Sequence, residues 1–247
     1  MVVLETARRT RIFAVQTARE APLAKQFTLT AADKHSLGAY RADPQGEAKG
    51  GLVVVQEIFG VNHHIRAVCD RIAAQGYVTV APALFDRQQP NFESGYSPDE
   101  IANARKFVAN PDWGAMMRDT QAAIDEAKKY GPAGVVGFCM GGSIAFLSAA
   151  KLNGLSAAVG FYGGQIIKSV DEKPKIPVQL HFGEKDASIP MSDVELIKQR
   201  RSGDCEIYVY PDAQHGFNCE ERGSYNETAA MLARDRAHAF FAKNLKK

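Results

Sequence analysis

The sequence predicts a single α/β domain with a mostly parallel sheet that helices cover on both faces. Continuous apolar, β-branched runs such as GGLVVVQEIFG (50–60) are typical of strands that are buried on both faces of a parallel sheet. Stretches of helical length alternate with these runs along the chain. Such alternation favours right-handed crossovers, with the functional side chains gathered at the carboxyl ends of the strands.

The chain is expected to begin with an arm and a hairpin. Residues 1–24 are rich in Thr, Ala and Arg without steady periodicity, so we expect an arm there, followed by one domain over 25–247. The arginines of the arm leave an organelle-targeting segment open as an alternative. The segments QFTLT (26–30) and HSLGAY (35–40) alternate with period two, which predicts an antiparallel hairpin.

Strand and helix units then follow one another. The buried strand at 50–60 precedes a predicted helix at 62–75 that Gly76 closes. The further predicted strands are 77–85, 133–139, 155–163, 176–184 and 205–211. The further predicted helices are about 99–109, 112–130, 140–152 and 226–243.

Composition excludes several function classes. The 247 residues are 45% hydrophobic, which suits one large core. Lys+Arg 30 against Asp+Glu 28 leaves a net charge of +2, too even for a nucleic-acid-binding surface. No apolar run approaches the roughly 18 residues that a membrane-spanning helix needs, and no signal peptide is evident. We therefore expect a cytoplasmic protein with small-molecule partners, as a monomer or a small homo-oligomer.

The segment VGFCMGGS (136–143) places a cysteine among glycines where a strand hands over to a helix. Gly137-Phe138-Cys139-Met140-Gly141 matches the G-x-nucleophile-x-G turn, in which glycines let neighbouring backbone approach. A thiol at a helix N-terminus is favoured as the nucleophilic thiolate. The alternative is a small buried cysteine that precedes a packing helix.

Two later residues complete the pattern of a nucleophile, an acid and a histidine in chain order. Asp186 follows a strand in LHFGEKD, and His215 follows the last strand in VYPDAQHGF. His215 is suited to accept the thiol proton, and Asp186 to orient the imidazole. The alternatives are Glu184 as the acid, Asp186 as a turn residue and His215 as a loop residue. We expect no metal role for the remaining histidines, since His63 and His64 begin a helix and His181 lies in a strand. The four cysteines also lack C-x-x-C spacing, so neither zinc nor structural disulfides are expected.

Four motifs, QEIFGVN (56–62), GFCMGG (137–142), GEKD (183–186) and HGF (215–217), together resemble the dienelactone hydrolases, or carboxymethylenebutenolidases, of the α/β-hydrolase fold. The likeness covers about residue 25 to the end. It implies a Cys139–His215–Asp186 triad that opens a lactone or enol ester through a thioester, without a cofactor. It also implies that Glu57 pairs with Cys139 at rest and swings away when substrate arrives; the alternative is a helix N-terminal acid.

The same resemblance implies an oxyanion hole and a carboxylate site. The backbone N–H groups of Ile58 and Met140 would bind the developing charge. The family holds a substrate carboxylate with arginines, one of them four residues after the histidine, where this chain has Cys219. The candidate substrate-binding residues are Arg222, Arg105, Arg87 and Phe217. A broader carboxylesterase or thioesterase, and a non-catalytic ligand-binding protein, remain as alternative functions.

Overall fold

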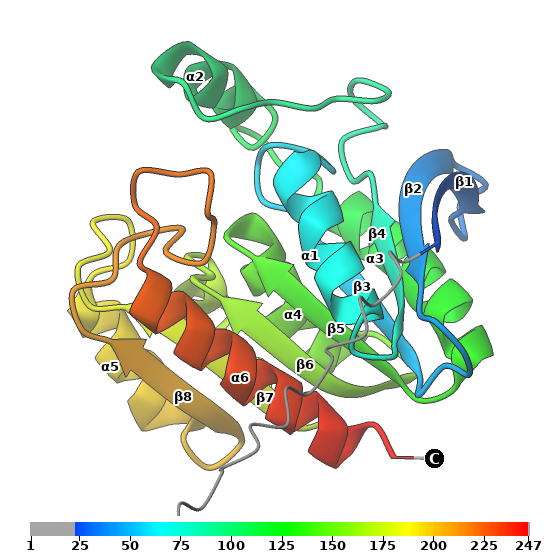
Figure 1. Ribbon diagram of the computed structural model, residues 1–247. Helices are drawn as coiled ribbons and strands as arrows, with labels where there is room; N and C mark the ends of the chain where they lie inside the picture. Colours follow the sequence, from blue (N-terminus) through cyan, green and yellow to red (C-terminus); the bar gives the residue numbers. More distant parts are fainter. Residues whose placement is uncertain (1–22, 247) are drawn as a thin grey trace, which may run out of the picture.

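The computed structural model describes residues 23–246, which contain an eight-stranded sheet (Figure 1). The strand order is β1-β2-β4-β3-β5-β6-β7-β8. β2 pairs antiparallel with both β1 and β4, and every other neighbouring pair is parallel. The strands are β1 (Leu23–Thr30), β2 (Ser36–Asp43), β3 (Gly51–Val55), β4 (Val78–Pro82), β5 (Ala133–Phe138), β6 (Leu155–Phe161), β7 (Val178–Gly183) and β8 (Cys205–Tyr210).

Helices cover both faces of this sheet. α1 and α6 lie on one face, α3, α4 and α5 lie on the other, and α2 stands apart from the sheet (Figure 1). The α-helices are α1 (His63–Ala73), α2 (Pro98–Lys106), α3 (Trp113–Ala127), α4 (Met140–Lys151), α5 (Met191–Arg201) and α6 (Glu227–Asn244). Two 3₁₀ turns are η1 (Lys128–Tyr130) and η2 (Ile166–Ser169). All residues of the central strands β3, β4 and β5 are buried, as their apolar runs predict.

The predicted order of strands and helices is confirmed, including the opening hairpin, with two differences. The first strand of the parallel part is shorter than predicted, because β3 ends at Val55 and residues 56–59 form a turn. Helix α5 was not expected from the sequence; it buries only Val194 and Ile197 and begins after Pro190 without a side-chain cap. Two buried positions are too few for a recognisable helical period.

The description of the fold covers residues 23–246. Most of the predicted arm (1–24) lies outside the described residues, and β1 already begins at Leu23. The division into an arm and one domain therefore stays a prediction. Within residues 23–246, none of the helices combines the length and the apolar character that a bilayer crossing requires.

The turn between β5 and α4 depends on glycine. A Cβ on Gly137 would collide with the backbone of Gly141 and Gly142, and a Cβ on Gly141 would collide with the Val55 and Gln56 carbonyls. The lack of side chains lets the Gly141 N–H donate to the Gln56 carbonyl oxygen at 3.1 Å. This bond joins the start of α4 to the turn that follows β3.

Gly137→Ala is therefore expected to destabilise the fold. Overpacking against fixed backbone costs about 1–3 kcal/mol of unfolding free energy, which lowers Tm by several degrees. Urea unfolding measures the effect. The matched control is Gly203→Ala, where a Cβ meets no atom within 4 Å, so the free energy should change by no more than about 0.5 kcal/mol. Equal stability of the two variants would contradict the steric argument.

Candidate active site

Cys139 lies at the carboxyl end of β5 and caps the N-terminus of α4. Its backbone has φ +54° and ψ −116°, a conformation that few non-glycine residues adopt and that stores strain. Its N–H donates to the Phe161 carbonyl oxygen at 3.0 Å, which ties the turn to the end of β6. All four cysteines are free thiols, and Cys139 is the one among them that is not buried.

His215 joins Cys139 to Asp186. Its Nε2 is 3.1 Å from Cys139 Sγ, and its Nδ1 is 2.7 Å from Asp186 Oδ2. The other Asp186 oxygen accepts the Ser188 N–H at 2.8 Å, which fixes the carboxylate. Burial alone would lower the pKa of His215, but the neighbouring Cys139 sulfur and Asp186 carboxylate raise it to about 10. This arrangement can hold a thiolate beside an imidazolium.

The competing acid, Glu184, points elsewhere. Its side chain is 43% exposed, and Oε2 lies 3.6 Å from Lys185 Nζ and 3.4 Å from the Asp212 backbone nitrogen. The Asp186 side chain is 0% exposed. Of the two acids, the structure therefore brings Asp186 to the histidine.

Glu57 lies in the turn after β3 and pairs with Arg222. Its Oε1 is 3.3 Å from Arg222 Nη1, and the Tyr162 side chain is a further hydrogen-bonding neighbour of the carboxyl. The residue is 1% exposed, and this burial raises the pKa of its carboxyl above the usual range, although Arg222 opposes the shift. Cys139 faces His215 in this arrangement, so the pairing of Glu57 with Cys139 stays a prediction.

The expected oxyanion donors lie at the same place. The backbone N–H groups of Ile58 and Met140 donate to no protein acceptor in the described part of the chain. Both residues line a pocket of about 470 Å³ together with Cys139 and His215. Unpaired backbone donors beside the Cys139 sulfur have the chemistry to stabilise an oxyanion.

The predicted cations separate into three environments. Arg105 lines the pocket, but Arg222 is directed to Glu57 and lies over the Phe59 and Tyr96 rings, with its guanidinium carbon 5.7 and 5.9 Å from their centroids. Arg87 is held by Asp119 at 2.7 and 2.8 Å and by Asp33 at 2.9 Å. Neither Arg222 nor Arg87 lines the pocket.

Phe217, the remaining substrate-binding candidate, is fully buried. It packs behind the histidine loop, with ring centroids 5.4 Å from Tyr162 and 5.2 Å from Tyr210. The position therefore supports the His215 loop from within the core instead of contacting a substrate in the pocket.

Two residues of the site escaped the sequence analysis. Tyr162 follows β6 with φ +39°, its ring packs 5.2 Å from His215, and its buried side chain is a neighbour of the Glu57 carboxyl. Its place after a parallel strand was the available indication. Lys168, in η2, lines the pocket beside Arg105. No pattern in the sequence connects Lys168 to the elbow, because the contact depends on the tertiary fold.

Comparison with known proteins identifies the family. The model of the dienelactone hydrolase family matches residues 37–245. The chain belongs to the dienelactone hydrolase family. One relative, the carboxymethylenebutenolidase of Pseudomonas putida, is 32% identical over 231 residues, which cover 89% of this chain and 97% of that protein. A Synechocystis sp. protein with a provisional carboxymethylenebutenolidase name is 39% identical over 229 residues, covering 85% of this chain and 93% of its own.

Solved structures agree with this family. A Klebsiella pneumoniae protein with a provisional dienelactone hydrolase name has a TM-score of 0.78 and 33% identity, covering 91% of this chain and 100% of its own. The dienelactone hydrolase of Anabaena variabilis has a TM-score of 0.69 at 18% identity, covering 92% and 100%, which shows a shared fold. The predicted α/β-hydrolase fold and family are confirmed, and this dienelactone hydrolase family member is a hydrolase.

Proposed function

We propose that the protein hydrolyses small lactones or enol esters of the dienelactone type through a thioester on Cys139. The observation that carries the proposal is the continuous hydrogen-bonded path from Cys139 Sγ through His215 to Asp186, with steps of 3.1 and 2.7 Å. Cys139 and His215 line a pocket together with Ile58 and Met140. A nucleophile, a base that a third group orients and nearby donors are the parts that acyl transfer requires.

The first half of the reaction forms the thioester. His215 holds the Cys139 proton, and the sulfur attacks the ester carbonyl carbon. The carbonyl oxygen becomes an oxyanion that the Ile58 and Met140 N–H groups stabilise; one such donor contributes about 3–4 kcal/mol to lowering a barrier. The ring C–O bond then breaks, and the leaving oxygen takes the proton from His215.

The second half returns the enzyme. His215 accepts a proton from water, and the water oxygen attacks the thioester carbonyl carbon. The carbonyl oxygen becomes a second oxyanion. The C–S bond breaks, the product leaves as a carboxylic acid, and Cys139 recovers its proton or pairs as thiolate with the imidazolium. The buried Asp186 carboxylate stabilises the imidazolium in both halves. The net change is the addition of one water molecule, and the chemistry needs neither a metal nor an organic cofactor.

In this proposal, Glu57 gives the Cys139 thiol a resting state in which it stays protonated. A carboxylate close to the sulfur opposes thiolate formation by like-charge repulsion, so pairing with Cys139 would hold the thiol protonated. The Arg222 contact at 3.3 Å gives the carboxylate an alternative partner when it leaves the sulfur. The two partners therefore correspond to a resting and an active state.

Arg105 and Lys168 are the proposed anchors of a substrate carboxylate, because both cations line the pocket with Cys139. Arg105→Ala is expected to raise KM for cis-dienelactone about tenfold while changing KM for p-nitrophenyl acetate little, since one charge-assisted hydrogen bond contributes about 1.5–3 kcal/mol. Steady-state kinetics with both substrates measures the difference. Lys106→Ala is the control, because Lys106 belongs to the same helix without lining this pocket.

The same measurement separates the alternative function. Strong preference of the unmodified enzyme for cis-dienelactone supports the proposal. Comparable or ester-only turnover would instead support a broader carboxylesterase or thioesterase on the same residues, which the replacement of a family arginine by Cys219 favours. Absence of turnover of either substrate would favour a ligand-binding protein. A cytoplasmic location and a monomer or small homo-oligomer complete the proposal.

A further inference from the structure

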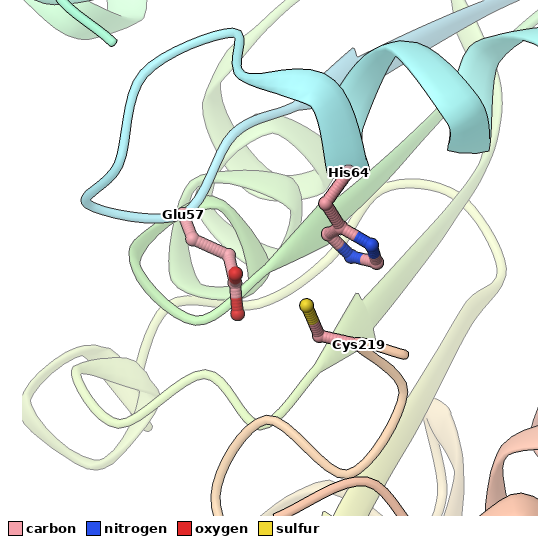
Figure 2. A group of neighbouring side chains, drawn as sticks. All are labelled: Glu57, His64 and Cys219. Atoms are coloured by element: carbon pink, nitrogen blue, oxygen red, sulfur yellow. The ribbon is translucent and has the colours of Figure 1, made fainter. Parts of the chain in front are cut away.

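Glu57, His64 and Cys219 form a second cluster of chemically active side chains, buried in the fold (Figure 2). They come from the turn after β3, the first turn of α1 and the loop that precedes α6. One potential ligand atom from each residue lies within 4.8 Å of those of the other two. Among residues 23–246, this is the one group of three residues whose potential metal-ligand atoms lie so close together.

The imidazole of this cluster lacks hydrogen-bond partners. His64 is 1% exposed, and neither ring nitrogen makes a hydrogen bond within the described residues. The Glu57 carboxyl has Arg222 and Tyr162 as polar neighbours, and the Cys219 sulfur has Tyr96. In Figure 2 the imidazole and the Cys219 sulfur lie across a small gap, with the carboxylate beside them. A buried polar atom without a partner costs about 1–3 kcal/mol. Two such atoms on one nearly inaccessible imidazole indicate a ligand that satisfies them.

The donor set selects the class of ligand. Imidazole nitrogen, thiolate sulfur and carboxylate oxygen are the three ligand types that Zn²⁺ uses in proteins, whereas Mg²⁺ and Ca²⁺ prefer oxygen alone. An imidazole binds a metal through the lone pair of its neutral form, and a cysteine binds as the thiolate, so metal binding at Cys219 releases a proton.

We propose that Glu57, His64 and Cys219 form a binding site for a thiophilic divalent cation such as Zn²⁺. A Zn–S bond forms as the Cys219 proton passes to solvent, one His64 nitrogen donates its lone pair, and Glu57 supplies Oε2. Three protein ligands leave a fourth position for water. The site departs from the expectation, drawn from sequence spacing, that neither His64 nor the cysteines bind metal.

The charges around the site are compatible with a dication. The Cys219 thiolate and the Glu57 carboxylate together balance the charge of Zn²⁺. Three arginines near His64, Arg222, Arg71 and Arg234, oppose a cation at this place. Arg222 contacts Glu57 Oε1 at 3.3 Å, and Glu220 pairs with Arg71 at 3.2 Å and with Arg234 at 2.7 Å, which offsets part of this repulsion. Because bound Zn²⁺ would also hold Glu57 in place, it is expected to slow ester hydrolysis, and this consequence alone rests on the proposed function.

The test measures binding without turnover and uses the full chain with Cys139→Ala, which removes the other thiol that faces a histidine. Cd²⁺ is the spectroscopic probe, because its thiolate complexes show an ultraviolet charge-transfer band, and calorimetry with Zn²⁺ gives the affinity. We expect one Cd²⁺ per chain with this band. Adding Cys219→Ser should abolish the band and weaken Zn²⁺ binding at least about 100-fold, the upper range for changes outside the ligand shell.

Controls make the outcome decisive. Cys205→Ser in the same background should keep the band, because Cys205 is buried at the start of β8, outside the cluster. His64→Gln should weaken Zn²⁺ binding as Cys219→Ser does; if this buried variant does not fold, Cys219→Ser decides alone. Failure of the Cys139→Ala protein to bind one metal ion, or a band that survives Cys219→Ser, would overturn the site. Neither readout depends on hydrolysis, so the proposed function can fail separately.

Discussion

Cys139→Ala is expected to abolish hydrolysis of cis-dienelactone and p-nitrophenyl acetate while leaving the fold intact. Removal of a nucleophile that acts with a histidine and an acid lowers kcat by about 10⁶-fold in a well-studied hydrolase, because the remaining groups cannot form the covalent intermediate. The alanine preserves the Cβ in the strained turn, so the circular dichroism spectrum should not change. Steady-state rates and the spectrum together measure the effect.

Cys205→Ala is the matched control, since Cys205 is a free cysteine that is buried in β8 and distant in sequence from the elbow. Its kcat should equal that of the unmodified enzyme. Iodoacetamide should add one label to the unmodified chain and none to Cys139→Ala, because the other three cysteines are buried. Turnover that persists in Cys139→Ala would remove this residue from the reaction.

Asp186→Asn is expected to lower kcat by about 10⁴-fold with little change in KM, the effect of the corresponding change in serine hydrolases. The amide has no charge to stabilise the imidazolium, and its NH₂ group can hold the ring in the wrong tautomer. The His215 contact at 2.7 Å places this residue in direct control of the imidazole. Its sensitivity should therefore exceed that of every other acid near the site.

Glu184→Gln provides the comparison for Asp186→Asn, since it makes the same chemical change two positions away. Glu184 is 43% exposed and contacts Lys185 and the Asp212 backbone, so its loss should leave kcat nearly unchanged. Steady-state kinetics on both variants measures the difference. A loss in Glu184→Gln equal to that in Asp186→Asn would show that the acid has been assigned to the wrong residue.

The residues at the ends of strands were predictable, because their environment is local. The elbow around Cys139 requires glycines that the sequence displays, and Cys139, Asp186 and His215 follow one another in the order that is typical of α/β-hydrolases. The burial of GLVVV in β3 follows from its composition. These features depend on neighbours in the chain or on general rules of sheet packing.

The partners of long charged side chains were not predictable in the same way. Arg222 follows the HGF motif and Arg87 follows PALFD in the sequence, and in the structure they face Glu57 and Asp119 respectively. His64 begins a helix, where exposure is common, but α1 turns it inward to 1% exposure. Such choices depend on which elements meet in space. The weakly patterned α5 escaped prediction for the related reason that its surface is mostly exposed.

Cys139 and the two pocket cations, Arg105 and Lys168, belong to different kinds of structural elements, and this difference affects how the enzyme can evolve. Cys139 and Asp186 of the proposed triad follow the buried strands β5 and β7, whereas Arg105 and Lys168 belong to α2 and η2, and both are exposed. Substitutions at these two positions should cost little stability, since exposed positions tolerate change. Substrate preference can therefore change, in evolution or by engineering, without changes to the proposed triad. Variant libraries for new esters should begin at Arg105 and Lys168.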